Sequence, residues 1–370
     1  MKNFKVTDLA HMRAALALAR RGLGNTWPNP AVGCVIVNDG RVVGRGWTQP
    51  GGRPHAETEA LVRAGALAMG ATAYVTLEPC SHHGKTPPCA EALIAAGVSR
   101  VVAAVEDPDP RVSGRGTKRL RDAGIAIDTG LCAEEAAELN AGFFMRVKQG
   151  RPLVTLKLAT SLDGRIATVT GESRWITGAA ARERAHLLRA THDAVLVGTG
   201  TALADDPQLT CRLPGLEHRS PVRVVLDRHL RLPATLRLIS EAGDTPIWVV
   251  ALPSGDPARQ AVLADQGVKI IAAEPDAAGG MDLAALLRRL GDEGLTRLLV
   301  EGGGILAAAL LRLGLIDRLV WMRAPMIIGG DGIPAVAALD FGALANSPRF
   351  MLVSSETAGG DLIETYRRAE

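Results

Sequence analysis

Short apolar runs alternate with segments of helical spacing along the chain, and this alternation limits the fold more than any other feature of the sequence. In the first half, the runs that predict strands cover residues 31–37, 41–46, 73–77 and 100–105. The segments that predict helices cover residues 7–21, 55–69 and 89–96. Because strands that alternate with helices build a sheet covered by helices, the first half predicts a layered α/β domain.

A short break rich in glycine and proline, Gln149-Gly150-Arg151-Pro152, interrupts this pattern near the middle of the chain. Beyond the break, the predicted strands cover residues 153–158, 194–198, 222–226, 247–250, 269–272 and 297–300, with a final hairpin over 351–356 and 361–366. The predicted helices cover residues 179–190, 283–290 and 305–313. A chain of 370 residues is longer than one hydrophobic core usually supports. We therefore expect two α/β domains, over residues 1–148 and 149–370.

The composition is that of a globular enzyme, and it argues against two classes of partner. Hydrophobic residues make up 47% of the chain, charged residues make up 22%, and the net charge is +3. The small charge, the scattered basic residues and an aromatic content of 3% argue against a nucleic-acid-binding surface. The sequence has no apolar stretch of membrane-spanning length and no signal-peptide core in residues 1–13, so we expect a cytoplasmic protein with no membrane partner.

Two of the five cysteines follow a histidine in a pattern typical of a metal site. His55-Ala56-Glu57 precedes Cys80 and Cys89, and each of these cysteines comes directly after a proline. One imidazole and two thiolates can hold zinc at three corners of a tetrahedron and leave the fourth corner to a water molecule. Zinc lowers the pKa of that water, and Glu57 is spaced to accept its proton without being a ligand. This pattern is typical of zinc-dependent nucleobase deaminases.

Two other interpretations of these residues stay open. The two cysteines are separated by eight residues, 81–88, instead of the usual two, and this segment contains His82 and His83. Either histidine can complete a closed, structural zinc site, although such a site has no use for Glu57. The thiols can also be free of metal. The remaining cysteines are expected to pack as small hydrophobic residues; they are Cys34, Cys132 and Cys211.

Glycines, a polar loop and two arginines are the candidate ligand-binding features of the second half. Gly302-Gly303-Gly304 begins a predicted helix, where backbone N–H groups can bind phosphate, although a tight turn explains these glycines equally well and a G-x-G-x-x-G fingerprint is absent. Residues 201–210 form a polar loop after a buried strand, a usual place for ligand contacts. Arg189 and Arg212 can bind a phosphate or remain solvated. Thr177 is expected to cap a helix.

Several of these stretches, taken together, resemble a known family. They are residues 29–33, 55–57 and 78–89 in the first half, and residues 159–164, 171–177, 204–210 and 301–303 in the second. The chain resembles the bifunctional deaminase–reductase of riboflavin biosynthesis, which has the same long spacing between the two cysteines. The resemblance covers nearly the whole chain. It implies a cytidine-deaminase-like three-layer α/β domain followed by a dihydrofolate-reductase-like domain.

The resemblance also implies a reaction sequence and its residues. The first domain would deaminate 2,5-diamino-6-(5-phosphoribosylamino)pyrimidin-4(3H)-one with release of ammonia, and the second would use NADPH to reduce the ribose to a ribityl chain. One zinc ion would be held by His55, Cys80 and Cys89, with Glu57 as proton shuttle. The implied substrate-binding residues are Asn29, Lys85, Ser173, Arg189, Leu209, Arg212 and Glu301. The implied NADPH contacts are Ala159, Trp175, Thr201, Asp205, Gly303, Gly304, Ile305, Leu306, Ala307, Ala308 and Ala309. A homodimer through the reductase domain is a further implication.

Two alternative functions remain at this point. The chain can be a base deaminase for nucleosides or tRNA with an unrelated second domain, although its small net charge and few aromatic residues argue against tRNA. It can also be a protein in which zinc only holds the fold or a partner surface. If the second domain is a reductase that acts on the ribose, opening of the ribose ring benefits from a nearby acid. Asp205 and Lys157 are both candidates, and the sequence does not decide between them.

Overall fold

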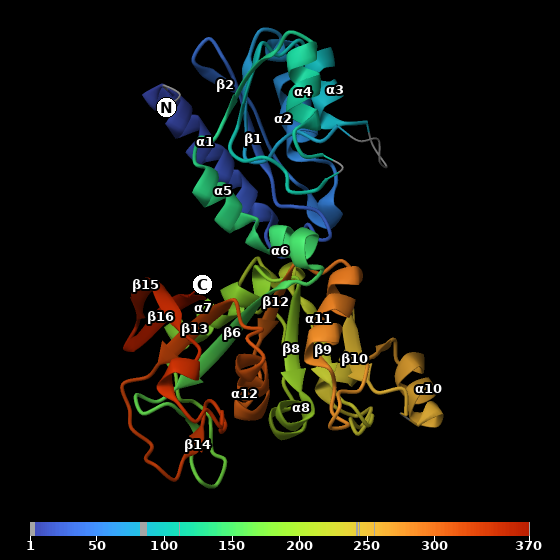
Figure 1. The fold of residues 1–370 in the computed structure, drawn as a ribbon, viewed down its shortest axis with the longest axis vertical. Coiled ribbons are helices and arrows are strands. Elements are labelled where there is room, and N and C mark those ends of the chain that lie inside the picture. Colours follow the sequence, from blue (N-terminus) through green and yellow to red (C-terminus); the bar gives the residue numbers. More distant parts are fainter. Residues whose placement is uncertain are drawn as a thin grey trace. The chain divides into compact units, whose positions relative to one another are not determined.

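The computed structural model describes residues 4–81, 87–110, 112–241, 243, 245–254 and 256–369. The chain divides into two compact units, Met1–Gly150 and Arg151–Glu370 (Figure 1). The division lies two residues beyond the boundary expected from the sequence, in the middle of the same glycine and proline break. Among the described residues, no helix has the length and apolar character needed to cross a membrane.

The first unit is built around a mixed sheet. Its strands, in spatial order, are β2 (Arg41–Trp47), β1 (Gly33–Asn38), β3 (Thr72–Val75), β4 (Arg100–Ala103) and β5 (Ala126–Thr129). Strand β1 pairs antiparallel with β2 and β3, whereas β3, β4 and β5 run parallel to one another. The carboxyl ends of β3 and β4 therefore lie at the same edge of the sheet.

Helices cover both faces of this sheet (Figure 1). They are α1 (Val6–Ala19), α2 (Ala56–Ala64), α3 (Cys89–Ala95), α4 (Arg115–Asp122), α5 (Ala133–Leu139) and α6 (Ala141–Gln149). Cys34 and Ile36 of β1 pack in a buried cluster with α2, α3 and α4, whereas Val35 and Val37 pack in another with α1 and α5. Since alternate residues of a strand point to opposite faces, one sheet supports two cores. The predicted three-layer domain is confirmed.

Glycine allows α2 to lie directly against β2. A Cβ added at Gly46 would lie 2.2 Å from the carbonyl oxygen of Ala56, closer than any real contact allows. The backbone of the first turn of α2 is therefore in close contact with the backbone of β2, an approach that only glycine at position 46 allows. The helix predicted over residues 55–69 is shorter in the structure. It ends at Ala64 because Gly65 adopts a positive φ of 53°, and a 3₁₀ turn follows over Gly65–Ala68.

The second unit is built around a sheet of nine strands. In spatial order they are β11 (Lys269–Ala272), β10 (Ile247–Ala251), β9 (Val222–Leu226), β8 (Ala194–Gly198), β12 (Arg297–Val300), β6 (Leu153–Thr160), β13 (Arg318–Arg323), β16 (Asp361–Arg368) and β15 (Phe350–Ala358). The seven strands from β11 to β13 run parallel, and β16 and β15 continue the sheet antiparallel. The loops that follow β9, β8, β12 and β6 consequently open at one edge of the sheet, where ligands bind in parallel α/β folds.

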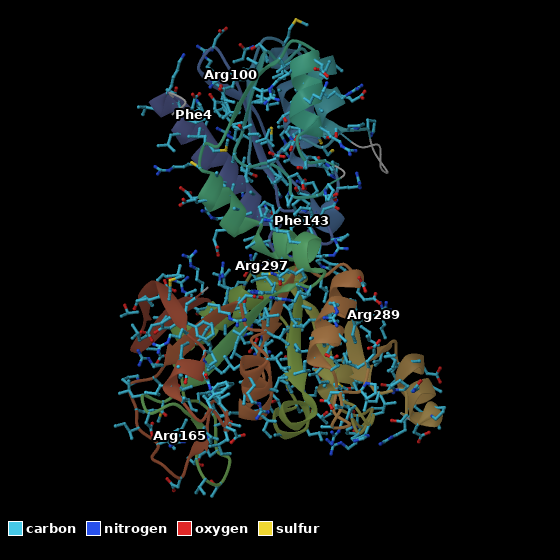
Figure 2. All side chains as sticks on the ribbon, viewed as in Figure 1. Phe4, Arg100, Phe143, Arg165, Arg289 and Arg297 are labelled. Carbon is cyan, nitrogen blue, oxygen red and sulfur yellow. The ribbon has the colours of Figure 1, made fainter. Side chains whose placement is uncertain are left out.

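The remaining elements of this unit pack on that sheet or beside it (Figure 1). They are α7 (Ala179–Ala190), α8 (Thr199–Asp205), α9 (Arg237–Ser240), α10 (Pro257–Asp265), α11 (Leu283–Asp292), α12 (Gly304–Arg312), and a small sheet of β7 (Arg165–Ala167) and β14 (Ile333–Pro334). Figure 2 shows the side chains on these elements, with Arg289 of α11 labelled. The second unit thus has the layered α/β architecture expected from the sequence.

Several local expectations were wrong or incomplete. The polar loop predicted over residues 201–210 begins inside α8, which ends only at Asp205. Thr177 does not cap a helix, because the N-cap of α7 is Gly178, and Thr177 is buried with its carbonyl oxygen bonded to Arg182. Strand β13 was missed, although it lies inside the sheet between β6 and β16. The strand has an arginine at each end, Arg318 and Arg323, so the apolar run between them is too short to have predicted a strand.

Candidate functional site

The three predicted metal ligands lie at the ends of three different elements of the first unit. His55 is the N-cap residue of α2, Cys80 follows β3, and Cys89 is the first residue of α3. The backbone N–H of Cys89 donates a hydrogen bond to the sulfur of Cys80 over 3.3 Å. The hydrogen bonds from the side chain and the backbone of Cys89 lower the pKa of the Cys80 thiol and so favour its thiolate.

The geometry of this cluster fits a zinc ion. His55 Nδ1 lies 3.3 Å from Cys89 Sγ and 3.7 Å from Cys80 Sγ, and all three ligand atoms lie within 4.8 Å of one another. Zinc–nitrogen and zinc–sulfur bonds of ordinary length place the ligands of a tetrahedron roughly 3.5 Å apart. One imidazole and two soft sulfurs are also the donors that zinc prefers. With three corners provided, the fourth is left for water or substrate.

Glu57 lies beside the ligands in a buried position. It is 4% exposed, and its carboxylate interacts with Cys89 and with the charge of His55. Burial raises the pKa of Glu57 to about 7. A carboxyl group with a pKa near neutrality can both accept and return a proton, which is the property that a proton shuttle needs.

Asn29 is held near the loop that leads to His55. Its side-chain nitrogen donates to the carbonyl oxygen of Gly52 over 2.8 Å, and a Cβ at Gly52 would lie 2.6 Å from that nitrogen. Among the described residues, the side-chain oxygen of Asn29 has no hydrogen-bond donor, so it can accept a hydrogen bond from a ligand amine. Lys85, the other predicted contact in this domain, lies outside the described residues, as do His82 and His83.

A carboxylate that the sequence analysis missed lies at the same edge of the sheet. Asp107 follows β4, is 6% exposed, and accepts a hydrogen bond from the backbone N–H of Asp109 over 2.8 Å. Burial raises the pKa of Asp107 to about 6, and the nearby charges of Asp109 and Glu78 add to this effect. The available signal was the acidic segment Glu106–Asp109, which follows a strand parallel to the one before Cys80.

In the second unit, a buried ion cluster lies between neighbouring strands and α7. Glu301, one residue beyond β12, accepts two hydrogen bonds from Arg189 of α7, over 2.6 and 3.0 Å. Lys157 of β6 lies 3.7 Å from the same carboxylate. Burial opposes ionisation of Glu301, but the charges of Arg189 and Lys157 outweigh it and lower the pKa of the carboxyl to about 2. The cluster is therefore charged throughout the neutral range.

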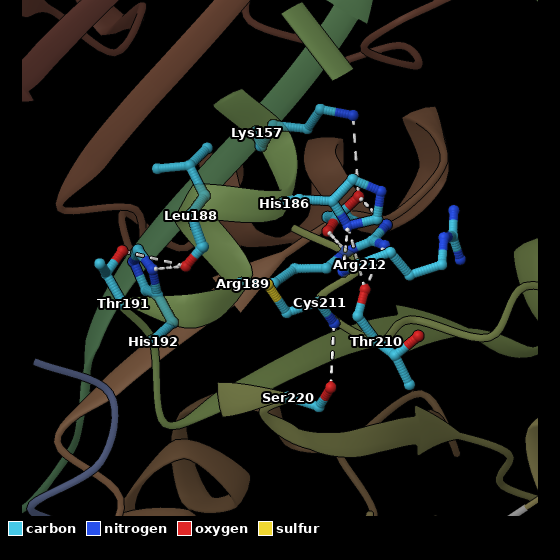
Figure 3. Close-up of polar contacts among 11 residues, drawn as sticks. Lys157, His186, Leu188, Arg189, Thr191, His192, Thr210, Cys211, Arg212 and Ser220 are labelled. Carbon is cyan, nitrogen blue, oxygen red and sulfur yellow. Dashed lines mark hydrogen bonds and ion pairs between the residues drawn. The ribbon is translucent and has the colours of Figure 1, made fainter. Parts of the chain in front are cut away.

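The loop after α8 completes this cluster (Figure 3). The carbonyl oxygen of Thr210 accepts a hydrogen bond from Arg189 over 3.0 Å and lies 3.1 Å from His186 Nδ1. The backbone N–H of Arg212 lies 3.2 Å from the same His186 nitrogen, and its guanidinium donates to Gln208. His186 was missed by the sequence analysis. The signal for it was its spacing of three residues from Arg189, which places both on one face of a helix.

The predicted cofactor turn lies next to the start of α8. A Cβ at Gly303 would lie 3.5 Å from the hydroxyl oxygen of Thr201, so these two predicted NADPH contacts are brought together. Ala307 N–H is already bonded to the carbonyl oxygen of Gly303, which leaves the first-turn N–H groups of Gly304, Ile305 and Leu306 to point out of the helix. Two adjacent helix starts form a region suited to the phosphates of a dinucleotide.

The other predicted contacts differ in what they can offer a ligand. Trp175 is 67% exposed and stacks on Arg182, while Arg174 donates to the backbone of Asp205 over 2.6 Å. Ser173 and Ala159 are half-buried, and Ala159 is in the second half of β6. Three of the predicted residues have side chains in the hydrophobic core and can contact a ligand through backbone atoms only; they are Leu209, Ala307 and Ala308.

Asp163 ties two segments of the second unit together, a role that the sequence analysis did not predict. Its carboxylate accepts hydrogen bonds from Ser161 over 2.6 Å and from the backbone N–H of Gly329 over 2.8 Å. The segment beyond Gly329 reaches the cofactor turn, where the N–H of Ala337 bonds to the carbonyl oxygen of Gly304 over 3.0 Å. The start of α12 is therefore bonded to the segment that Asp163 holds at Gly329.

Comparisons with known proteins agree with these two sites. Residues 5–105 match the sequence model of the cytidine and deoxycytidylate deaminase zinc-binding region, and residues 152–363 match that of the RibD C-terminal domain. The first match, to a zinc-binding region, contains all three predicted ligands, His55, Cys80 and Cys89.

Relatives with the same pair of domains align over nearly the entire chain. The riboflavin biosynthesis protein RibD of Escherichia coli is 44% identical, over 96% of this chain and 98% of its own length. The Aquifex aeolicus protein of the same name is 41% identical, over 98% of both. The structure of Acinetobacter baumannii RibD superimposes with a TM-score of 0.89 at 42% identity and covers 98% of this chain and 99% of its own. A Thermotoga maritima deaminase/reductase does so with a TM-score of 0.86 at 35% identity and the same coverage. The chain belongs to the RibD family of riboflavin biosynthesis proteins.

Proposed function

We propose that this chain catalyses two consecutive steps of riboflavin biosynthesis. The first is hydrolytic deamination of 2,5-diamino-6-(5-phosphoribosylamino)pyrimidin-4(3H)-one to 5-amino-6-(5-phosphoribosylamino)uracil, and the second is NADPH-dependent reduction of the ribose to the ribityl chain. The observation that carries the proposal is the His55–Cys80–Cys89 cluster with buried Glu57 beside it, on a chain whose second unit holds a charged cluster at the ligand-binding edge of its sheet. The cytoplasmic location expected from the sequence remains a prediction.

In the deaminase unit, bound zinc supplies a water molecule of lowered pKa at the fourth corner of its site. Glu57 accepts the proton that this water loses, because its carboxyl has a pKa near neutrality and lies against the ligands. The same carboxyl gives this proton to the ring nitrogen as hydroxide adds to the neighbouring ring carbon. It then takes the proton of the added hydroxyl and gives it to the amine, which leaves as ammonia. Asn29 positions the pyrimidine through the oxygen of its side chain, since its nitrogen is already bonded to Gly52.

In the reductase unit, NADPH supplies the hydride. The chain's own task is to hold the substrate so that its ribose faces the cofactor. Glu301 and Arg189 fix each other, and Arg212 lies beside them for the phosphate of the substrate. Of the two candidate acids, the geometry favours Lys157, because it lies within the cluster beside Glu301, whereas Asp205 ends α8 and has its carbonyl bonded to Arg174.

The purified full-length chain provides a direct test. Supplied with the phosphoribosylamino-pyrimidine, it should release ammonia, and NADPH oxidation should follow only after deamination or when the uracil product is supplied. Ammonia release from free cytidine but not from this compound would instead identify a nucleoside deaminase. Zinc binding with neither activity would leave a structural metal protein.

We also propose that two copies of the chain pair through the outer strand of the reductase sheet. Strand β15 is the edge strand of that sheet, and Met351, Leu352 and Val353 on it are 42%, 57% and 58% exposed. Exposed apolar edge strands pair readily with another strand, and a two-fold axis can join two copies of β15 in antiparallel fashion. Sedimentation of the wild type should give a dimer, and the substitution Leu352→Lys should give a monomer. A monomeric wild type would contradict the proposal.

A further inference from the structure

The segment that carries Asn29 is anchored by buried side chains. Residues 31–33 direct three successive backbone N–H groups at side-chain oxygens. The acceptors belong, in this order, to Asn140, Thr48 and Thr76, over 2.9, 2.9 and 3.0 Å. The three residues are 3%, 2% and 0% exposed. Because a buried polar group without a partner costs free energy, each of these bonds fixes one residue of the segment.

Asn140 bonds both backbone groups of Ala31 through two different atoms of its side chain. Its Oδ1 accepts from the N–H of Ala31 over 2.9 Å, and its Nδ2 donates to the carbonyl oxygen of Ala31 over 3.0 Å. Among the described residues, Ala31 has no backbone partner for either group. A side-chain amide is suited to this task, since it presents an acceptor and a donor in one plane. The position of Ala31 therefore depends on Asn140.

The backbone of Asn140 is held by two helices. The residue ends α5 and begins α6. Its N–H donates to the carbonyl oxygen of Ala136 over 3.2 Å, and its own carbonyl oxygen accepts from the N–H of Phe144 over 2.9 Å. The amide is therefore presented to Ala31 from a rigid position. Groups that position a site act best when regular elements hold them in this way.

Asn29 lies two residues before Ala31 and is joined to it by Pro30. The ring of Pro30 fixes its own φ, so a displacement of Ala31 is passed on to Asn29. The side chain of Asn29 in turn donates to Gly52, in the loop that leads into α2, over 2.8 Å. The contacts that begin at Asn140 thus end on the residue whose side-chain oxygen is proposed to hold the pyrimidine.

On this basis, and resting on the proposed deaminase function, we infer that Asn140 is a positioning residue of the deaminase reaction. It holds Ala31, and through it Asn29, at the place where the pyrimidine binds. Among the described residues its side chain bonds to Ala31 alone, so it acts on substrate affinity through Asn29. The zinc ligands and Glu57 belong to other elements, and their chemistry should proceed at an unchanged rate once substrate is bound.

Steady-state ammonia release by the full-length chain tests this inference as a double-mutant cycle. The side chain of Asn140→Ser is too short to make both bonds to Ala31. This variant should raise KM for the phosphoribosylamino-pyrimidine about threefold to tenfold and change kcat little, as expected when a hydrogen bond to bound substrate is weakened. The variant Asn29→Ala should raise KM at least as much. The double variant should have the KM of Asn29→Ala, because Asn140 acts through Asn29, whereas a purely structural role makes the two factors multiply.

The matched control is Asn38→Ser, at the other end of β1 from the anchored segment. The side-chain nitrogen of Asn38 also donates to two backbone carbonyls, those of Leu67 and Met69, over 2.8 and 3.2 Å. The control should change neither KM nor kcat. Metal analysis should find one zinc ion per chain in every variant, which shows that the deaminase unit is folded.

If Asn140→Ser loses zinc, Asn140→Asp takes its place in the cycle, because it keeps the acceptor for the N–H of Ala31. Three results overturn the inference alone: factors that multiply in the cycle, an unchanged KM in the variant of Asn140, or loss of zinc from both of its variants. A wild type that releases no ammonia from the phosphoribosylamino-pyrimidine overturns the proposed deaminase function together with it.

Discussion

The two proposed sites of this chain are assembled from different kinds of residue. The deaminase site uses His55, Cys80 and Cys89, which are chemically specialised and lie within 4.8 Å of one another. The reductase site uses common residues such as Arg189 and Glu301, which are separated by 112 positions and meet only through the order of the strands. A metal centre is therefore recognised by its residue types, whereas a site for an organic cofactor is recognised by its place in the sheet.

The difference extends to the way each site handles charge. In the deaminase unit, the ligand atoms are brought together around a position for a cation, and their arrangement depends on it. In the reductase unit, the carboxylate of Glu301 is neutralised by two cations of the chain itself, at 2.6 and 3.7 Å. The first site should therefore depend on an added ion, and the second should keep its shape without one.

Removal of the metal should separate the two sites most clearly. Dialysis against a strong chelator is expected to abolish ammonia release, because the water at the fourth corner loses the charge that lowers its pKa. Reduction of supplied 5-amino-6-(5-phosphoribosylamino)uracil should continue at the wild-type rate. Assays of both reactions before and after zinc is restored check this. Simultaneous loss of both activities would contradict the independence of the sites.

The substitution Glu57→Gln should be the next largest effect. It removes the proton shuttle and keeps the shape of the side chain, so ammonia release should fall by about a hundredfold to ten-thousandfold. Zinc content, measured by metal analysis, should stay at one ion per chain, since Glu57 is not a ligand. The reductase activity serves as the internal control. Full deaminase turnover in a variant that retains zinc would refute the role of Glu57.

The substitution Glu301→Gln tests the charged cluster of the reductase unit. It leaves Arg189 buried without its partner, which costs about 3–5 kcal/mol in the free energy of unfolding. Urea unfolding of the full-length chain, followed by fluorescence, measures this change. The exposed pair Arg237–Glu241 provides a matched control, and Glu241→Gln should change the unfolding of the same unit little. Equal effects of the two substitutions would show that burial does not strengthen the cluster.

The smallest effect is a dependence of stability on pH that belongs to the reductase unit. His192 is 2% exposed, with its ring nitrogens bonded to Leu188 and Thr155, and burial lowers its pKa to about 3. Between that value and the unfolded value of 6.5, the unfolded chain binds the extra proton. Stability should therefore fall as the pH drops below 6.5, by up to about 1.4 kcal/mol per pH unit.

The comparison of His192→Gln with the wild type isolates this contribution. The variant should have a flatter dependence of its urea midpoint on pH between about 7 and 5, because it has no group there to protonate on unfolding. The buried Asp193 is common to both proteins and cancels in the comparison. The exposed His218 supplies the control, since His218→Gln should leave the wild-type slope in place. An equally steep slope in His192→Gln would show that other groups cause it.

Much of the fold followed from local pattern. The helix predicted over residues 179–190 and the strands predicted over 194–198 and 222–226 have the same bounds in the structure. These are long or strongly apolar segments whose burial decides their structure. The helix predicted over 55–69 was too long, because a glycine with positive φ at Gly65 ends it. Strand β13 was missed because its burial comes from its neighbours in the sheet, and its own sequence is mixed.

The residues of the zinc centre could be named from the sequence because few arrangements of histidine and cysteine have another use. The amino-acid types alone determined that chemistry, since a thiolate or an imidazole binds zinc wherever the chain brings it. The pairing of Arg189 with Glu301 and the bond of Asp163 to Gly329 were decided by the tertiary structure alone. Arginines and carboxylates are mostly solvated, and their role depends on which neighbours the order of strands places beside them and on how far burial strengthens the charges between them.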